Sequence, residues 1–129
     1  MLTRHHIEVF RKLLKRRFLE VREEIRQALL ASDEQRFLDI AGRVGDLEDA
    51  SVADLLVDVS LAGVDRLVAE IRDIDAALLR IAEGGYGVCA DCGEDIDVQR
   101  LDAWPTAKRC RSCQERYESL TATLRGPSL

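Results

Sequence analysis

The sequence predicts a mainly α-helical protein: a long antiparallel helical hairpin, followed by a small finger built on four cysteines and a C-terminal helix. Two long segments carry apolar residues at alternating steps of four and three, which is the spacing of a coiled-coil seam. Aromatic residues make up only 5% of the chain, so Leu, Ile, Val and Ala must form the core, which suits helices better than a β-sandwich. No proline precedes Pro105, so no helix before it is interrupted by a missing backbone N–H.

The first expected helix runs from about residue 5 to about Gly42. Charged residues fill the faces that the seam leaves free, as in a two-helix coiled coil. Ser32 and Asp33 loosen the pattern, but an apolar stripe resumes after them and continues the helix. The seam residues expected to be buried are Phe10, Leu14, Phe18, Val21, Ile25 and Ala28, and the resumed stripe is Phe37, Leu38 and Ala41.

A turn is expected at about residues 42–51, because Gly42 and Gly45 can both adopt the left-handed conformation that ends a helix. Asp49 or Ser51 can then cap the next helix by accepting hydrogen bonds from its first free N–H groups. From the residues alone, a stabilising interaction of Asp46 and its acidic neighbours with the dipole of that helix is favoured over a functional role.

The return helix is expected from about Val52 to Glu83, and Gly84 ends it. Its seam residues are Leu67, Ile71, Ile74, Leu78 and Ile81. The chain then divides into a hairpin at 1–84 with its tip at about 42–51, a finger segment with a C-terminal helix at 85–125, and a tail at 126–129. The hairpin and the finger are expected to be stabilised by separate contacts.

Composition and charge exclude several classes of function. The net charge is −5, and residues 31–60 hold eight acidic side chains against two basic ones, which argues against direct, sequence-specific DNA binding. No segment resembles a signal peptide or is long enough to span a bilayer, so a cytoplasmic protein without membrane contact is expected. His5 and His6 lack a recognisable catalytic partner, so an enzyme is not expected.

The four cysteines predict one structural zinc ion. Cys89 and Cys92 form one CxxC pair, Cys110 and Cys113 form the other, and seventeen residues separate the pairs. Two such knuckles can place four thiolates around one ion, and this spacing is typical of zinc sites. A redox-active CxxC pair is the alternative, but it normally accompanies a βαβ unit, which the sequence lacks. The predicted architecture is therefore a helical hairpin with a four-cysteine zinc finger.

Residues 85–96 (GYGVCADCGEDI) and 100–113 (RLDAWPTAKRCRSC) resemble the DksA/TraR family of bacterial zinc-finger transcription regulators. The family pattern is approximately G-x-C-x-x-C-G-x-x-I, then R-L-x-A-x-P, then a second CxxC. The preceding hairpin also fits the family. The resemblance implies a protein that binds RNA polymerase, with no catalytic residues, and that inserts its coiled-coil tip into the secondary channel to modulate initiation.

The resemblance also assigns roles to particular residues. Family members carry D-x-x-D-x-A at the tip, and here Asp46 and Asp49 match, whereas Ser51 replaces the final alanine. Members that bind guanosine tetraphosphate use basic residues at positions that hold Trp104 and Gln114 here. Neither side chain can pair with phosphate as a cation does, so a nucleotide site in the finger is not expected.

Other functions remain open from the sequence. The second hypothesis is a zinc-stapled paralogue with an altered tip, acting as an adaptor for another partner. A thiol-based stress sensor, in which oxidation ejects zinc, is a third class. A nucleic-acid-binding finger is less favoured, because the basic stripe and aromatic platforms that it needs are absent.

Overall fold

The structure is a computed structural model that describes the chain apart from residues 1, 47–48, 57–58, 60, 62 and 126–129; at 49–51 and 124–125 it describes the backbone alone. Within the described residues the chain forms helices in the order α1 (Arg4–Leu30), α2 (Gln35–Val44), α3 (Asp49–Leu55), α4 (Val64–Glu83), α5 (Val98–Ala103) and α6 (Arg111–Arg125). The described part contains one isolated β-bridge, between Val88 and Asp95, and no strand. The predicted mainly helical fold is confirmed.

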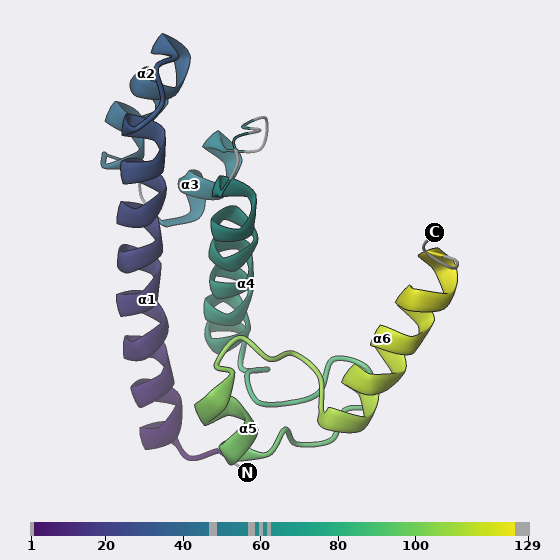
Figure 1. The fold of residues 1–129 in the computed structure, drawn as a ribbon. Coiled ribbons are helices and arrows are strands. Elements are labelled where there is room, and N and C mark those ends of the chain that lie inside the picture. Colours follow the sequence, from purple (N-terminus) through teal and green to yellow (C-terminus); the bar gives the residue numbers. More distant parts are fainter. Residues whose placement is uncertain (1, 47–48, 57–58, 60, 62, 126–129) are drawn as a thin grey trace.

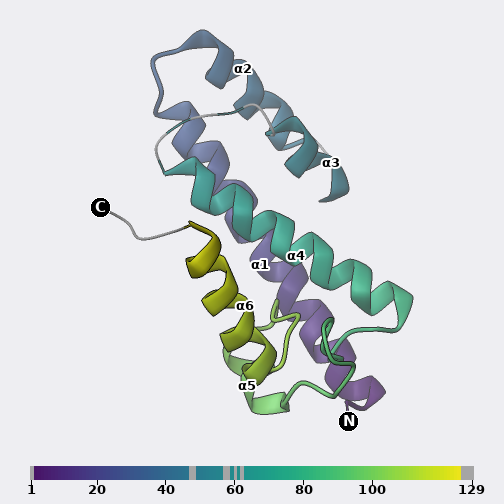
Figure 2. The same ribbon diagram turned by 90° about the vertical axis from the view of Figure 1, so that its right-hand side faces the viewer.

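Helices α1 and α4 form the hairpin and lie side by side (Figures 1 and 2). Thr3 caps α1 through a reciprocal pair of hydrogen bonds, in which the His6 backbone N–H donates to the Thr3 hydroxyl and the Thr3 N–H donates to the His6 ring. Most of the predicted seam is buried between the helices, but Leu29 replaces Ala28 at the end of α1, and in α4 Leu78 and Ile81 are only partly buried whereas Ala77 is fully buried. The buried seam residues of α1 are Phe10, Leu14, Phe18, Val21, Ile25 and Leu29, and those of α4 include Leu67, Ile71 and Ile74.

The first predicted helix is wrong in its length, because the chain reverses at residues 31–34. The Ser32 hydroxyl accepts a 3.1 Å hydrogen bond from the Glu34 N–H, a local bond that competes with continuation of the helix. The following α2 folds back against α1 (Figure 2). Gly45, just after α2, then lies near the Arg26 side chain. The resumed apolar stripe therefore belongs to a separate helix, which buries Phe37, Ala41 and Val44.

The predicted turn and return helix also need correction. Gly42 lies inside α2, and Gly45 follows that helix with a right-handed φ of −68°, so neither uses the left-handed conformation. Asp49 begins α3 and Ser51 lies within it, so neither residue precedes the helix as a cap. Residues 56–63 separate α3 from α4, and Gly63, with φ of 87°, permits the sharp entry into α4.

The finger segment contacts the base of the hairpin rather than standing apart from it. Tyr86 packs on Phe10 of α1 with ring centroids 5.8 Å apart, and its hydroxyl donates a 2.7 Å hydrogen bond to the Pro105 carbonyl. Leu2 packs on Gly87, beside the fully buried Leu101 of α5. These residues join one continuous core with the hairpin seam, so the expectation of separate stabilising contacts is wrong.

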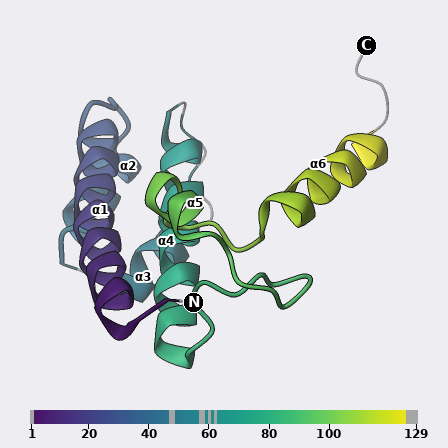
Figure 3. The same cartoon turned by 90° about the horizontal axis from the view of Figure 1, so that it is seen from below.

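The C-terminal helix α6 leads away from the hairpin (Figures 1 and 3). Its first turn carries Cys113, which is buried, whereas Tyr117 and Leu120 are exposed farther along. In the part of the chain that the structure covers, no helix combines the length and apolar character needed to cross a membrane.

Candidate metal centre and hairpin tip

The four cysteines come together at the end of the finger. Cys89 and Cys92 lie in the loop between α4 and α5, Cys110 immediately precedes α6, and Cys113 lies in its first turn. Their sulfur atoms all lie within 4.8 Å of one another, and Cys92 Sγ is 3.8 Å from Cys110 Sγ. Among the described residues, this is the group of His, Cys, Asp or Glu side chains placed to hold a metal ion.

Backbone hydrogen bonds shape the first knuckle. The Gly93 N–H donates to the Cys89 carbonyl over 3.0 Å, and the Cys89 N–H donates to the Glu94 carbonyl over 2.8 Å. Gly93 has φ of 77°, which a residue with a Cβ adopts only with strain, so glycine is needed immediately after Cys92. The turn directs Cys89 and Cys92 toward the same point.

The two knuckles are tied together by contacts that involve no cysteine side chain. The Ala90 N–H donates a 2.8 Å hydrogen bond to the Lys108 carbonyl. Arg109 Nε donates to Asp91 Oδ2, also over 2.8 Å, so an ion pair joins the middle of the first CxxC to the residue before the second. The donor atoms are therefore assembled by the protein scaffold itself.

Electrostatics in the cluster favour a bound cation. Hydrogen bonding to Cys110 and burial raise the pKa of the Cys113 thiol to about 12. Burial opposes ionisation of Cys89 too, but backbone hydrogen bonds from both knuckles outweigh it and lower its pKa to about 6. Four neighbouring thiols cannot all ionise without a compensating cation, and a divalent ion that binds thiolates supplies that charge. The site therefore fits a zinc ion, held by four sulfur atoms with no position left for a substrate.

The residues predicted for the hairpin tip are only partly described. Asp46 is exposed, just beyond the end of α2. Asp49 and Ser51 belong to α3, but their side chains lie outside the described residues. Helices α2 and α3 lie toward the end of the hairpin opposite the finger (Figure 1). The acidic segment therefore lies at the end of the molecule away from the metal centre.

Trp104 and Gln114, the two positions implied by the family to be basic in nucleotide-binding members, line one small cavity of about 150 Å³. Arg80, Lys108 and Arg109 also line it. Two of these cations are already engaged, since Arg80 donates to the Thr106 carbonyl and Arg109 to Asp91. The absence of a nucleotide site in the finger stays a prediction.

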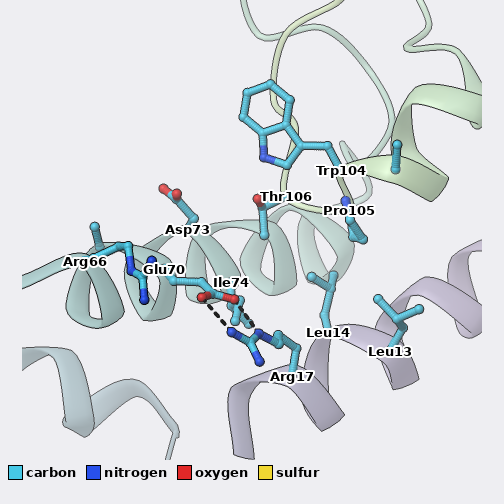
Figure 4. A pocket seen from close by; sticks show the side chains of 12 residues that line it. Leu13, Leu14, Arg17, Arg66, Glu70, Asp73, Ile74, Trp104, Pro105 and Thr106 are labelled. Atoms are coloured by element: carbon cyan, nitrogen blue, oxygen red, sulfur yellow. Dashed lines mark hydrogen bonds and ion pairs between the residues drawn. The ribbon is translucent and has the colours of Figure 1, made fainter. Parts of the chain in front are cut away.

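A groove of about 420 Å³ runs between the hairpin and the loop that precedes the second knuckle (Figure 4). Its apolar sides include Leu14, Ile74 and the partly exposed Trp104. At one end Arg17 Nη2 of α1 donates a 2.9 Å hydrogen bond to Glu70 Oε1 of α4. The sequence did not reveal this groove, because its residues come from three separate segments with no shared motif.

Comparison with known proteins identifies the family of this chain. Residues 84–119 match the model of the prokaryotic dksA/traR C4-type zinc finger. The RNA polymerase-binding transcription factor DksA of Caulobacter vibrioides is 32% identical over 114 residues, covering 87% of this chain and 75% of its own length. The chain belongs to the DksA/TraR family. Its membership confirms the predicted single structural zinc and the expectation that it is not an enzyme.

Solved structures of the DksA/TraR family share the fold. Transcription factor DksA2 from Pseudomonas aeruginosa superposes with a TM-score of 0.60 at 28% identity, covering 92% of this chain and 87% of that one. The DnaK suppressor protein from Agrobacterium tumefaciens gives a TM-score of 0.56 at 31% identity, covering 85% and 92%. The hairpin-and-finger architecture is thus the family's own.

Proposed function

We propose that this protein binds RNA polymerase and modulates transcription initiation by inserting the distal end of its hairpin into the secondary channel. Membership of the DksA/TraR family carries the proposal, since the relative from Caulobacter vibrioides is named as an RNA polymerase-binding transcription factor. The four-sulfur zinc site supports it as well, because a closed site holds structure and leaves action to the hairpin.

The shape and charge of the hairpin suit such a role. Helix α1 has 27 residues and is therefore roughly 40 Å long at 1.5 Å per residue. Helix α2 lies toward the end away from the finger (Figure 1). The helix and the segments next to it carry exposed acidic side chains, among them Asp33, Asp39 and Asp46. A rigid acidic end can perturb the basic and metal-bound groups around a nucleotidyl-transfer site, where charge is decisive.

Asp49, supported by Asp46, forms the pair through which the protein is proposed to act on RNA polymerase. Asp49→Asn removes the charge with little change in shape, so it should abolish regulation in an in vitro transcription assay and leave binding to core RNA polymerase nearly intact. Asp65→Asn, at the start of α4, is the matched control and should regulate as the parent does. If Asp49→Asn regulates as well as the parent, the pair is not the acting group.

An adaptor without tip activity is the second candidate, and two observations favour it. Ser51 replaces the alanine of the family motif, and the chain reverses at 31–34, before the acidic segment is reached. If the parent binds polymerase without regulating transcription and Ser51→Ala gains regulation, the adaptor is the better description. Failure of the parent to co-purify with core polymerase would remove the proposed regulation of polymerase and leave an adaptor for another partner or the thiol sensor.

A further inference from the structure

Three basic residues lie beside or within the second cysteine pair, and the structure distinguishes them. Arg109 is the least exposed of them, with 14% of its side chain exposed. Arg111 is 86% exposed and pairs with Glu115 one helical turn along α6. Lys108 is exposed, and its backbone carbonyl rather than its amine contacts the first knuckle. Of the three, Arg109 is placed to act on the metal centre through its side chain.

Arg109 contacts three separate parts of the finger. Its Nε donates to Asp91 of the first knuckle over 2.8 Å. Its guanidinium lies over the ring of Tyr117 in α6, 3.9 Å from the ring centroid, a cation–π contact. Its backbone carbonyl accepts a 3.1 Å hydrogen bond from Arg100 Nε of α5. One residue therefore holds both knuckles and the flanking helices in register.

This arrangement has two consequences for zinc. Closing the knuckles before the ion arrives reduces the conformational freedom lost on binding, and it keeps a released sulfur close enough to bind again. The guanidinium also places a positive charge beside a zinc–tetrathiolate group whose net charge is about −2. Both effects slow the loss of zinc, and only the first depends on Asp91.

We propose that Arg109, held between Asp91 and Tyr117, is the positioning residue that closes the two cysteine knuckles on each other and sets how slowly the site releases zinc. Zinc-ligand chemistry belongs to the four cysteines, and Arg109 acts through the geometry of the loops that carry them. The inference concerns the metal centre alone and holds whether or not the hairpin acts on RNA polymerase.

The test is the rate at which the full-length zinc-loaded protein transfers zinc to an excess of a chromogenic chelator. Arg109→Gln should release zinc about tenfold faster, the lower end of the usual effect of removing a group that supports metal ligands. Asp91→Asn should accelerate release several-fold, and Tyr117→Leu less. Arg111→Gln removes a neighbouring cation without disturbing the Arg109–Asp91 ion pair, so it is the matched control. Its zinc-release rate should stay within about twofold of that of the parent.

A double variant separates positioning from general loosening of the finger. If Arg109 acts through Asp91, then Asp91→Asn combined with Arg109→Gln should release zinc no faster than Arg109→Gln alone. Arg109→Lys keeps the charge but loses the planar guanidinium group, so its zinc-release rate should lie between those of the parent and Arg109→Gln.

Two outcomes would overturn the proposal. One is an equal zinc-release rate for Arg109→Gln and Arg111→Gln, and the other is independent effects of the substitutions at Asp91 and Arg109. If Arg109→Gln loses helical circular dichroism, the comparison of the zinc-release rates of Asp91→Asn and Arg111→Gln tests the proposal instead.

Discussion

At the scale of single residues, the Arg17–Glu70 pair joins α1 to α4 by charge (Figure 4). The hydrogen bond from Arg17 holds the pKa of Glu70 below its usual value. About a third of each side chain is exposed, so solvent screens much of the attraction. The pair therefore serves the register of the hairpin more than its total stability.

Glu70→Gln should lower the free energy of unfolding at pH 7 by about 0.5–1 kcal/mol. Because the pKa of Glu70 is lowered in the folded protein, its contribution is complete above the pKa of the unfolded chain and is lost as the pH falls through the folded value. The difference between parent and variant should thus shrink in acid. Urea unfolding at pH 7 and pH 3 measures it, and an undiminished difference at pH 3 would show that packing, not charge, is responsible.

At the scale of elements, each break in the helices has its own cause. Ser32 ends the run of α1 through its side-chain bond to Glu34 N–H, and Gly63 opens α4 with a left-handed backbone. Gly42, by contrast, sits in α2 with a helical backbone and no neighbouring atom within 4 Å of an added Cβ. Gly63 is therefore required for its left-handed backbone, whereas the helical backbone of Gly42 would accept another residue.

Gly63→Ala should lower the free energy of unfolding by about 1–2 kcal/mol, because alanine at φ of 87° is strained although the site has room for its Cβ. Gly42→Ala should instead raise it by about 0.5–1 kcal/mol, since alanine restricts the unfolded chain and favours the helix. Thermal unfolding of the two variants checks both signs. The same sign for both would mean that the described geometry of one position is wrong.

At the scale of the whole molecule, the finger and the hairpin share one core. Leu101 of α5 is fully buried, and Tyr86 and Leu2 connect it to the first turns of α1. A zinc ion held by the four cysteines would order the finger segment to which Tyr86 and Leu101 belong. Loss of the ion should therefore destabilise the base of the hairpin as well as the cysteine loops.

Removing zinc with a chelator should raise hydrogen exchange in the finger and also in α1 around Phe10 and at the end of α4, while α1 around Ile25 stays protected. Leu101→Ala should produce the same loosening in the presence of zinc, with a cost of about 2–5 kcal/mol for the cavity left behind. Exchange mass spectrometry on both samples tests this. Unchanged protection around Phe10 would restore the picture of two separately stabilised parts.

The sequence by itself determined most of the seam residues, the zinc site and the order of hairpin, finger and C-terminal helix. Each of these rests on spacing along the chain: four-three steps for the seams, and CxxC pairs for the metal centre. Such patterns are local, so they can be recognised without knowing which segments meet.

The tertiary structure decided the rest, because it depends on contacts between segments far apart in sequence. The stripe of Phe37 and Ala41 has the same helical period whether α1 continues or folds back, and packing against α1 selects the reversal at 31–34. Three arginines and lysines beside Cys110 look equivalent in sequence, yet only the position of Asp91 in the first knuckle makes Arg109 the one that closes the site.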